Sequence, residues 1–223
     1  MLMPMVLERA LRWSDECHRR QTRKGGETAY FTHLAGVALI LQRHGFDDEV
    51  VVAGLLHDVV EDTAATLDDV RDRFGPNVAD LVRWCSEIKL DDQGHKLPWI
   101  KRKRDHLAAL AGDPHLALAA APRRALAVIL ADKLHNLVSM ACDLRDGRHV
   151  WLRFNAERDQ VLWYYHAVID SADPDDPLLK PLADECRRVL ARIEAPDDEL
   201  TDADACRSVA TQGENPRAAP QDG

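Results

Sequence analysis

The feature that most constrains this chain is the spacing of its apolar residues, which follows the α-helix throughout. Leu34, Val37, Ala38 and Leu41, for example, recur at intervals of three and four residues and would share one helix face. Val, Ile and Thr nowhere alternate with polar residues over the length of a strand, as a half-buried strand would require. The sequence therefore predicts an all-α fold.

Turn and capping signals divide this pattern into successive helices. Thr66 and Asp69 resemble a capping box that opens a short helix, which the Phe74-Gly75-Pro76 turn then closes. Gly45 is expected to end the helix that begins near His33. We expect further helices around residues 6–11 and over residues 50–60, 77–88, 96–110, 123–145, 154–171 and 178–193, with a helix pair in the alanine-rich stretch that Pro114 and Pro122 interrupt.

The length and the polarity of the C-terminal end predict one domain and a tail. With 223 residues, the chain can bury a core without disulfides or a structural zinc ion. No repeat or linker divides residues 1–195, so we expect a single domain there. Residues 196–223 are polar and contain almost no large apolar side chain, which predicts a disordered tail.

Composition argues against several classes of partner. The formal net charge is −9, from 29 Lys+Arg against 38 Asp+Glu, which disfavours a protein that coats nucleic acid or an anionic membrane. No apolar run approaches the roughly 18–20 residues of a bilayer span, and Glu8 and Arg9 come too early for a signal peptide. The five cysteines are scattered and form no C-x-x-C, as in reducing compartments. We expect a cytoplasmic protein with no nucleic-acid or membrane partner.

The segment His57-Asp58-Val59-Val60-Glu61-Asp62 places four ionisable side chains at the end of an apolar helix. Burying a neutral polar group without a partner costs roughly 2–7 kcal/mol, and burying a charge costs more. A divalent metal ion is the obvious partner. Asp58 and Asp62 are four residues apart and Glu61 follows Asp58 by three, so these groups would project from adjoining faces of one helical turn.

Completing a metal site requires ligands from other helices. His33 stands at the start of an apolar helix, and Asp132 interrupts a run of apolar residues. Two imidazoles and two carboxylates favour Mn²⁺ or Fe²⁺ over a structural zinc ion. Each residue also has a simpler interpretation: His33 as a helix-start residue, and Asp132 as the partner of Lys133 or Arg124 on a solvated face.

Several blocks, in this order, carry a resemblance to a known family. They are residues 18–25 (HRRQTRKG), 30–33 (YFTH), 55–63 (LLHDVVEDT), 74–75 (FG), 101–104 (KRKR) and 130–137 (LADKLHNL). The set resembles the HD-domain hydrolases of the RelA/SpoT type, and in particular the short, stand-alone alarmone hydrolases, over about residues 7–165. The resemblance implies an HD-domain helical bundle.

The resemblance also implies a role for each matching residue. It implies that one Mn²⁺ is bound by His33, His57, Asp58 and Asp132, and that Glu61 and Asp62 orient or deprotonate the attacking water. It implies nucleotide contacts from Arg23, Lys24 and Asn136, and an aromatic contact near the ligand from Tyr164.

The activity implied is hydrolysis of the 3′-pyrophosphate of ppGpp or pppGpp to GDP or GTP and pyrophosphate. The length leaves no room for the synthetase and regulatory domains of the long members, so we expect hydrolysis alone. Two alternatives remain: the same fold acting on a related nucleotide, such as an adenosine analogue or another phosphomonoester, and a catalytically silent nucleotide sensor. Intact Glu61 and Asp62 count against the sensor. The sequence leaves base preference and oligomeric state open.

Some residues depart from the family pattern or have no assigned role. Leu34 replaces a common Pro, Val138 a common Arg, and Trp99 stands near a family Lys, which bears on substrate choice. A second basic cluster, Lys96 with residues 101–104, either steers a polyanion at the pocket mouth or forms a solvated helix face. We interpret the remaining histidines as surface or capping residues; they are His44, His95, His106, His115, His149 and His166.

Overall fold

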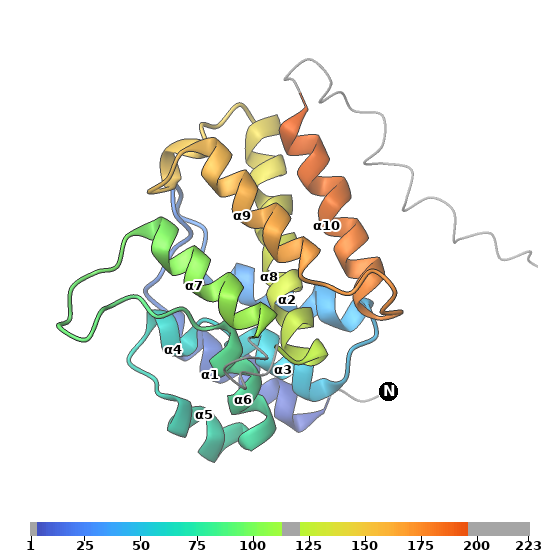
Figure 1. Ribbon diagram of the computed structural model, residues 1–223. Helices are drawn as coiled ribbons and strands as arrows, with labels where there is room; N and C mark the ends of the chain where they lie inside the picture. The colour runs from blue at the N-terminus through green and yellow to red at the C-terminus, as the bar shows by residue number, and fades with distance from the viewer. Residues whose placement is uncertain (1–3, 113–120, 196–223) are drawn as a thin grey trace, which may run out of the picture. The chain divides into compact units, whose positions relative to one another are not determined.

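The computed structural model describes residues 4–112 and 121–195, and within these ranges it contains no strand, only two isolated bridges (Figure 1). The helices are α1 (Met5–His18), α2 (Phe31–Arg43), α3 (Asp48–Leu56), α4 (Val59–Asp62), α5 (Leu67–Phe74), α6 (Pro76–Cys85), α7 (Trp99–Ala111), α8 (Arg123–Arg145), the 3₁₀ helix η2 (Trp151–Arg153), α9 (Arg158–Asp170) and α10 (Leu179–Glu194). The predicted all-α fold is confirmed.

Two predictions concern residues that the structure does not describe. The helix pair expected around Pro114 falls largely within residues 113–120, and the disordered tail falls within residues 196–223; both lie outside the described residues. The described residues up to Ile193 belong to one compact unit, called here the first unit. The domain boundary after residue 195 stays a prediction.

Helix α8 is the centre of the first unit. Its side chains pack against α2, α3 and α6, and it contacts α9 as well. By length and composition α8 could cross a membrane, but the core helix of a folded domain meets the same criterion, and 56% of its most apolar window is buried inside this structure. This long and largely buried helix is thus the element against which the other helices pack.

The predicted capping box at the start of α5 is present. The hydroxyl of Thr66 accepts a hydrogen bond from the Asp69 amide at 3.2 Å, and the Asp69 carboxylate accepts one from the Thr66 amide at 2.8 Å. Helix α5 ends at Phe74 because Gly75, with φ of 91°, adopts a left-handed conformation that favours glycine. Pro76 then begins α6, where its missing amide hydrogen costs nothing.

The prediction of one continuous helix over residues 50–60 is wrong. Helix α3 ends at Leu56, residues His57 and Asp58 form a turn, and α4 begins at Val59. Neighbouring residues on a continuous helix point about 100° apart. Breaking the helix here lets two adjacent side chains approach one point, with His57 Nε2 and Asp58 Oδ2 3.0 Å apart.

Three other helices are shorter than predicted. Helix α6 ends at Cys85 instead of residue 88. Helix α7 begins at Trp99 instead of residue 96, because the Leu97 amide donates to the Lys89 carbonyl and holds the preceding residues in a turn. Helix α9 begins at Arg158 instead of residue 154, because Glu157 and Gln160 form a capping box at its start.

Candidate active site

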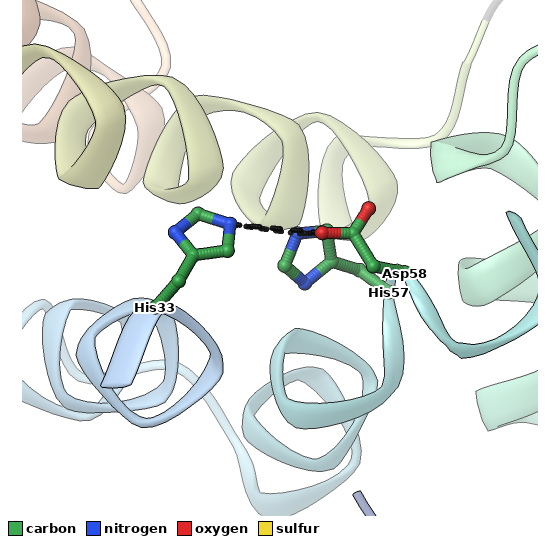
Figure 2. A group of neighbouring side chains, drawn as sticks. All are labelled: His33, His57 and Asp58. Carbon is green, nitrogen blue, oxygen red and sulfur yellow. Dashed lines mark hydrogen bonds and ion pairs between the residues drawn. The ribbon is translucent and has the colours of Figure 1, made fainter. Parts of the chain in front are cut away.

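The side chains predicted as metal ligands converge in the interior of the first unit. His33 comes from α2, His57 and Asp58 from the turn after α3, and Asp132 from the middle of α8. Figure 2 shows His33 facing His57 and Asp58, and donor atoms of these three lie within 4.8 Å of one another. Asp132 Oδ1 lies 3.1 Å from His33 Nε2 and 3.7 Å from His57 Nε2.

The two imidazoles are oriented by hydrogen bonds on their far sides. His57 Nδ1 bonds to the Gly54 carbonyl at 2.8 Å, so the ring carries its proton there. His33 Nδ1 lies 2.9 Å from His135 Nδ1, and one proton is shared between them. Both Nε2 atoms therefore face the carboxylates. These Nε2 atoms are therefore the ones that can present a lone pair to a metal ion.

The donor atoms fit a divalent ion. Metal–ligand bonds of roughly 2.0–2.2 Å put neighbouring donors roughly 3 Å apart. Here, His57 Nε2 lies 3.0 Å from Asp58 Oδ2, and the two Nε2 atoms are 3.3 Å apart. Nitrogen and carboxylate donors together suit borderline divalent ions. This His/Asp cluster indicates a divalent metal site.

Electrostatics in the cluster favours charged carboxylates. Burial alone would raise the pKa of Asp132, but the ammonium of Lys133, bonded to its Oδ2 at 2.6 Å, and the histidines hold that pKa well below its usual range. The pKa of Asp58 is likewise lowered by His57 against the effect of burial. Burial would lower the pKa of His57, yet Asp58 and Asp132 raise it well above its usual value. The two carboxylates thus stay ionised, as the ligands of a metal ion must be.

Helix α4 places Glu61 and Asp62 beside this cluster, where Lys89 holds both. The Lys89 ammonium lies 3.0 Å from Glu61 Oε1 and donates to Asp62 Oδ1 at 2.6 Å. The Glu87 amide donates to Glu61 Oε2 at 3.1 Å. Burial raises the pKa of Glu61, and the charge of Asp58 raises it further. A carboxylate with a raised pKa is suited to accept a proton near neutral pH.

The residues predicted to contact nucleotide lie on the same cavity. Arg23 donates to Asn136 Oδ1 at 2.5 Å, and Asn136 donates to Asp132 Oδ1 at 2.6 Å. These two bonds link the basic turn, which contains Arg23 and Lys24, to the His/Asp cluster. Lys24 is exposed at the rim. Tyr164 is buried, and its hydroxyl lies 2.8 Å from His106 Nδ1.

One cavity of about 540 Å³ gathers every residue predicted for the site. Its walls include Arg23, Lys24, His33, His57, Asp58, Glu61, Asp62, Asp132, Asn136 and Tyr164. The volume lies in the range of small-molecule sites, which is roughly 300–1,000 Å³. A cavity with acidic metal-binding groups and basic groups on its walls can hold a cation and a phosphorylated ligand together.

The sequence interpretation missed several residues of the cavity. His106 was predicted to be a surface or capping residue, and this is wrong: it is 8% exposed and lines the cavity. Its spacing of four residues from the buried Leu110 was the available signal. His135 was not assigned a role, although it follows Asp132 by three residues. Lys89 gave no signal, because it lies in a loop segment without periodicity.

Some residues of the second basic cluster, Lys96 with residues 101–104, line the cavity, and others lie on an exposed helix face. Lys96, Arg102 and Lys103 line the cavity, whereas Lys101 is outside its lining, where it pairs with Asp105. Arg104 is exposed. Of the residues that depart from the family pattern, Trp99 lines the cavity, Leu34 is fully buried and Val138 is exposed.

Comparison with known proteins identifies the family. Residues 10–160 match the HD domain. The chain is 34% identical over 134 residues to the guanosine-3′,5′-bis(diphosphate) 3′-pyrophosphohydrolase of Aquifex aeolicus and 36% identical over 134 residues to the bifunctional (p)ppGpp synthase/hydrolase SpoT of Escherichia coli K12. Each match covers 60% of this chain but 18% of the relative, so the chain spans under a fifth of their length.

A solved structure matches over nearly its whole length. It is described as a metazoan ortholog of SpoT that hydrolyses ppGpp, and it superimposes with a TM-score of 0.65 at 32% identity, covering 84% of this chain and 97% of its own. A crystal structure from Listeria monocytogenes EGD-e gives a TM-score of 0.59 at 36% identity, covering 76% of this chain and 100% of its own. The resemblance inferred from the sequence blocks is confirmed, and the chain belongs to the HD-domain family.

Proposed function

We propose that this protein is a metal-dependent hydrolase that removes the 3′-pyrophosphate of ppGpp or pppGpp, giving GDP or GTP and pyrophosphate. The observation that carries the proposal is that one cavity holds a His/Asp cluster, a Glu-Asp pair and a basic turn. The choice of ppGpp as substrate rests on the relatives that are named as ppGpp hydrolases.

The proposed ligands are His33, His57, Asp58 and Asp132, and the proposed ion is Mn²⁺. Two imidazoles and two carboxylates form the mixed nitrogen and oxygen set that suits Mn²⁺, and they lack the thiolates typical of structural zinc sites. When bound, the ion supplies Lewis-acid activation of water and of a phosphoryl oxygen.

Glu61 and Asp62 would aim the attacking water and accept its proton. Attack on the phosphorus breaks its bond to the 3′ oxygen, which takes up a proton as pyrophosphate leaves. General base catalysis of this kind contributes about 10²–10⁴-fold. Lys89, bonded to both carboxylates, holds them in position. Arg23, Lys24 and Asn136 would bind the nucleotide, with the Arg23 guanidinium suited to a bidentate contact.

A second candidate is the same hydrolysis on a related nucleotide, such as an adenosine analogue or another phosphomonoester. The observation that favours it is Trp99 on the cavity wall, near a position where the family has a lysine. A silent sensor would have no use for the Glu61–Asp62 pair. We propose a cytoplasmic location, in keeping with a nucleotide substrate.

The test is to incubate the metal-stripped protein with ppGpp, with and without Mn²⁺, and to follow GDP and pyrophosphate. Metal-dependent release of both in equal amounts is expected. Parallel reactions with the adenosine analogue test the second candidate. A Glu49→Gln variant changes an exposed carboxylate outside the cavity lining and should retain activity, whereas Asp132→Asn should lose it. No turnover of any nucleotide by metal-loaded protein would refute the proposal.

A further inference from the structure

Two lysines from different helices converge on one wall of the cavity. Lys103 of α7 and Lys133 of α8 place their ammonium groups 4.4 and 5.5 Å from the centre of the Tyr164 ring. Both side chains line the cavity but are only 15% and 13% exposed. Two ammonium groups so sheltered from water repel each other more strongly than they would on an open surface.

Negative charge on this wall is shared among several cations. Glu87 pairs with Lys103 and, at 3.2 Å, with Arg102. Lys133 pairs with Asp132, whose other oxygen faces His33 in the proposed metal site. Among the pairs that the structure describes here, three cations thus share two carboxylates. A divalent ion on Asp132 would leave Lys133 still less neutralised.

The pKa of Lys103 and the neighbouring aromatic rings are consistent with repulsion between the two ammonium groups. Burial lowers the pKa of Lys103, and the charge of Lys133 lowers it further, against the pull of Glu87. The Tyr164 hydroxyl is engaged by His106, so the face of its ring is what the lysines meet. The rings of Trp99 and Tyr164 meet in a T-shaped arrangement, with centroids 6.0 Å apart. A small anion at this wall would relieve the repulsion between the lysines.

We propose that Lys103 and Lys133 form a phosphate-binding subsite that takes a phosphoryl or pyrophosphoryl group of the substrate. This subsite is additional to the basic turn at Arg23 and Lys24. The identity of the nucleotide rests on the proposed function, but the affinity for a phosphate group does not. Glu87 occupies Lys103 when the subsite is empty and competes with the anion for it.

The probe is inorganic pyrophosphate, titrated by calorimetry into metal-free protein. Lys103→Met should weaken pyrophosphate binding about tenfold, because it removes a charge-assisted hydrogen bond to the anion, and a tenfold loss corresponds to about 1.4 kcal/mol. The matched control is Lys101→Met on the same helix, since Lys101 is 54% exposed, lies outside the cavity lining and pairs with Asp105. Equal affinity in Lys103→Met and wild type, or equal losses in both variants, would overturn the proposal.

A Glu87→Gln variant separates binding from a structural role. If Lys103 serves an anion, removing its competing carboxylate should tighten pyrophosphate binding several-fold. If Lys103 serves only to neutralise Glu87, the affinity should not rise, and the proposal fails. Should Lys103→Met lose its helical circular dichroism, the double variant Lys103→Met/Glu87→Gln removes both partners of the pair and gives the same comparison against Glu87→Gln alone.

Turnover then tests the link to the substrate. In the active, metal-loaded enzyme, Lys103→Met should raise KM for the nucleotide about tenfold and change kcat less. Pyrophosphate binding that depends on Lys103 in a protein without ppGpp hydrolysis would keep the subsite and reject the proposed function. Hydrolysis with Lys103-independent pyrophosphate binding would do the reverse.

Discussion

The close approach of Gly36 to His135 offers a test of whether His135 orients the proposed metal ligand His33. A Cβ atom added at Gly36 would lie 2.1 Å from His135 Cδ2 and 2.2 Å from its Nε2. Van der Waals contact requires about 3.5–4.0 Å, so Gly36→Ala must push the His135 ring away by more than 1 Å. That movement breaks the 2.9 Å bond that orients His33.

Two opposing effects set the change in stability. Overpacking costs about 1–3 kcal/mol, while alanine gains about 1 kcal/mol over glycine within a helix. We expect Gly36→Ala to lower the free energy of unfolding by about 0–2 kcal/mol. Loss of a partner that orients a metal-binding histidine typically costs 10–100-fold in metal affinity. The larger effect should therefore be on Mn²⁺ binding.

The assay is a cycle of Gly36→Ala, His135→Ala and the double variant, measured by urea unfolding and by Mn²⁺ titration. In the double variant the clash is absent, so the stability cost of Gly36→Ala should disappear. Its Mn²⁺ affinity should stay as low as that of His135→Ala, because His33 has lost its partner in both. A Gly36→Ala protein with wild-type Mn²⁺ affinity, or a double variant that regains it, would refute the reasoning.

Three further predictions follow from individual contacts. Glu61→Gln/Asp62→Asn should lower kcat by about 10²-fold or more while Mn²⁺ binding persists, as checked by kinetics and metal titration. Burial and the charges of neighbouring lysines lower the pKa of His106 to about 4, against the pull of Glu87, so its neutral form stabilises the fold. The metal-free protein should lose stability as pH falls from about 6.5 to about 4, by up to 1.4 kcal/mol per pH unit, and His106→Gln should lose this component in urea unfolding. Thr66→Ala should lower the free energy of unfolding by about 1 kcal/mol in the same assay, because the Asp69 amide at the start of α5 loses its hydrogen-bond acceptor.

The sequence predicts those parts of the fold that depend on local periodicity and capping. The α5 capping box and the bounds of α8 follow directly from it. The break at His57 and Asp58 could not be read in this way, because apolar spacing continues across it and only the converging side chains require it.

The site was predictable where its residues lie within contiguous blocks, and less so where contacts join distant segments. Lys89 reaches Glu61 and Asp62 from the loop after α6, whose sequence carries no helical or strand pattern. His106 reaches Tyr164 across 58 residues of chain. The second of these contacts depends on how α7 and α9 pack, which the spacing of apolar residues within one helix does not specify. The roles assigned to individual residues stay predictions that the experiments above address.

Helix α8 explains how one element can serve both the core and the cavity. At 100° per residue, the positions of His135, Asp132, Asn136 and Lys133 cover about 160° of its circumference. Leu130, Leu134 and Leu137 fall on the opposite side and are fully buried. Each residue on the polar side has a different role. His135 bonds to His33, Asp132 is a proposed metal ligand, Asn136 accepts from Arg23, and Lys133 is a proposed phosphate-binding residue. A one-residue shift of this helix would move all four together, so its register against α2 and α3 sets the geometry of the whole site.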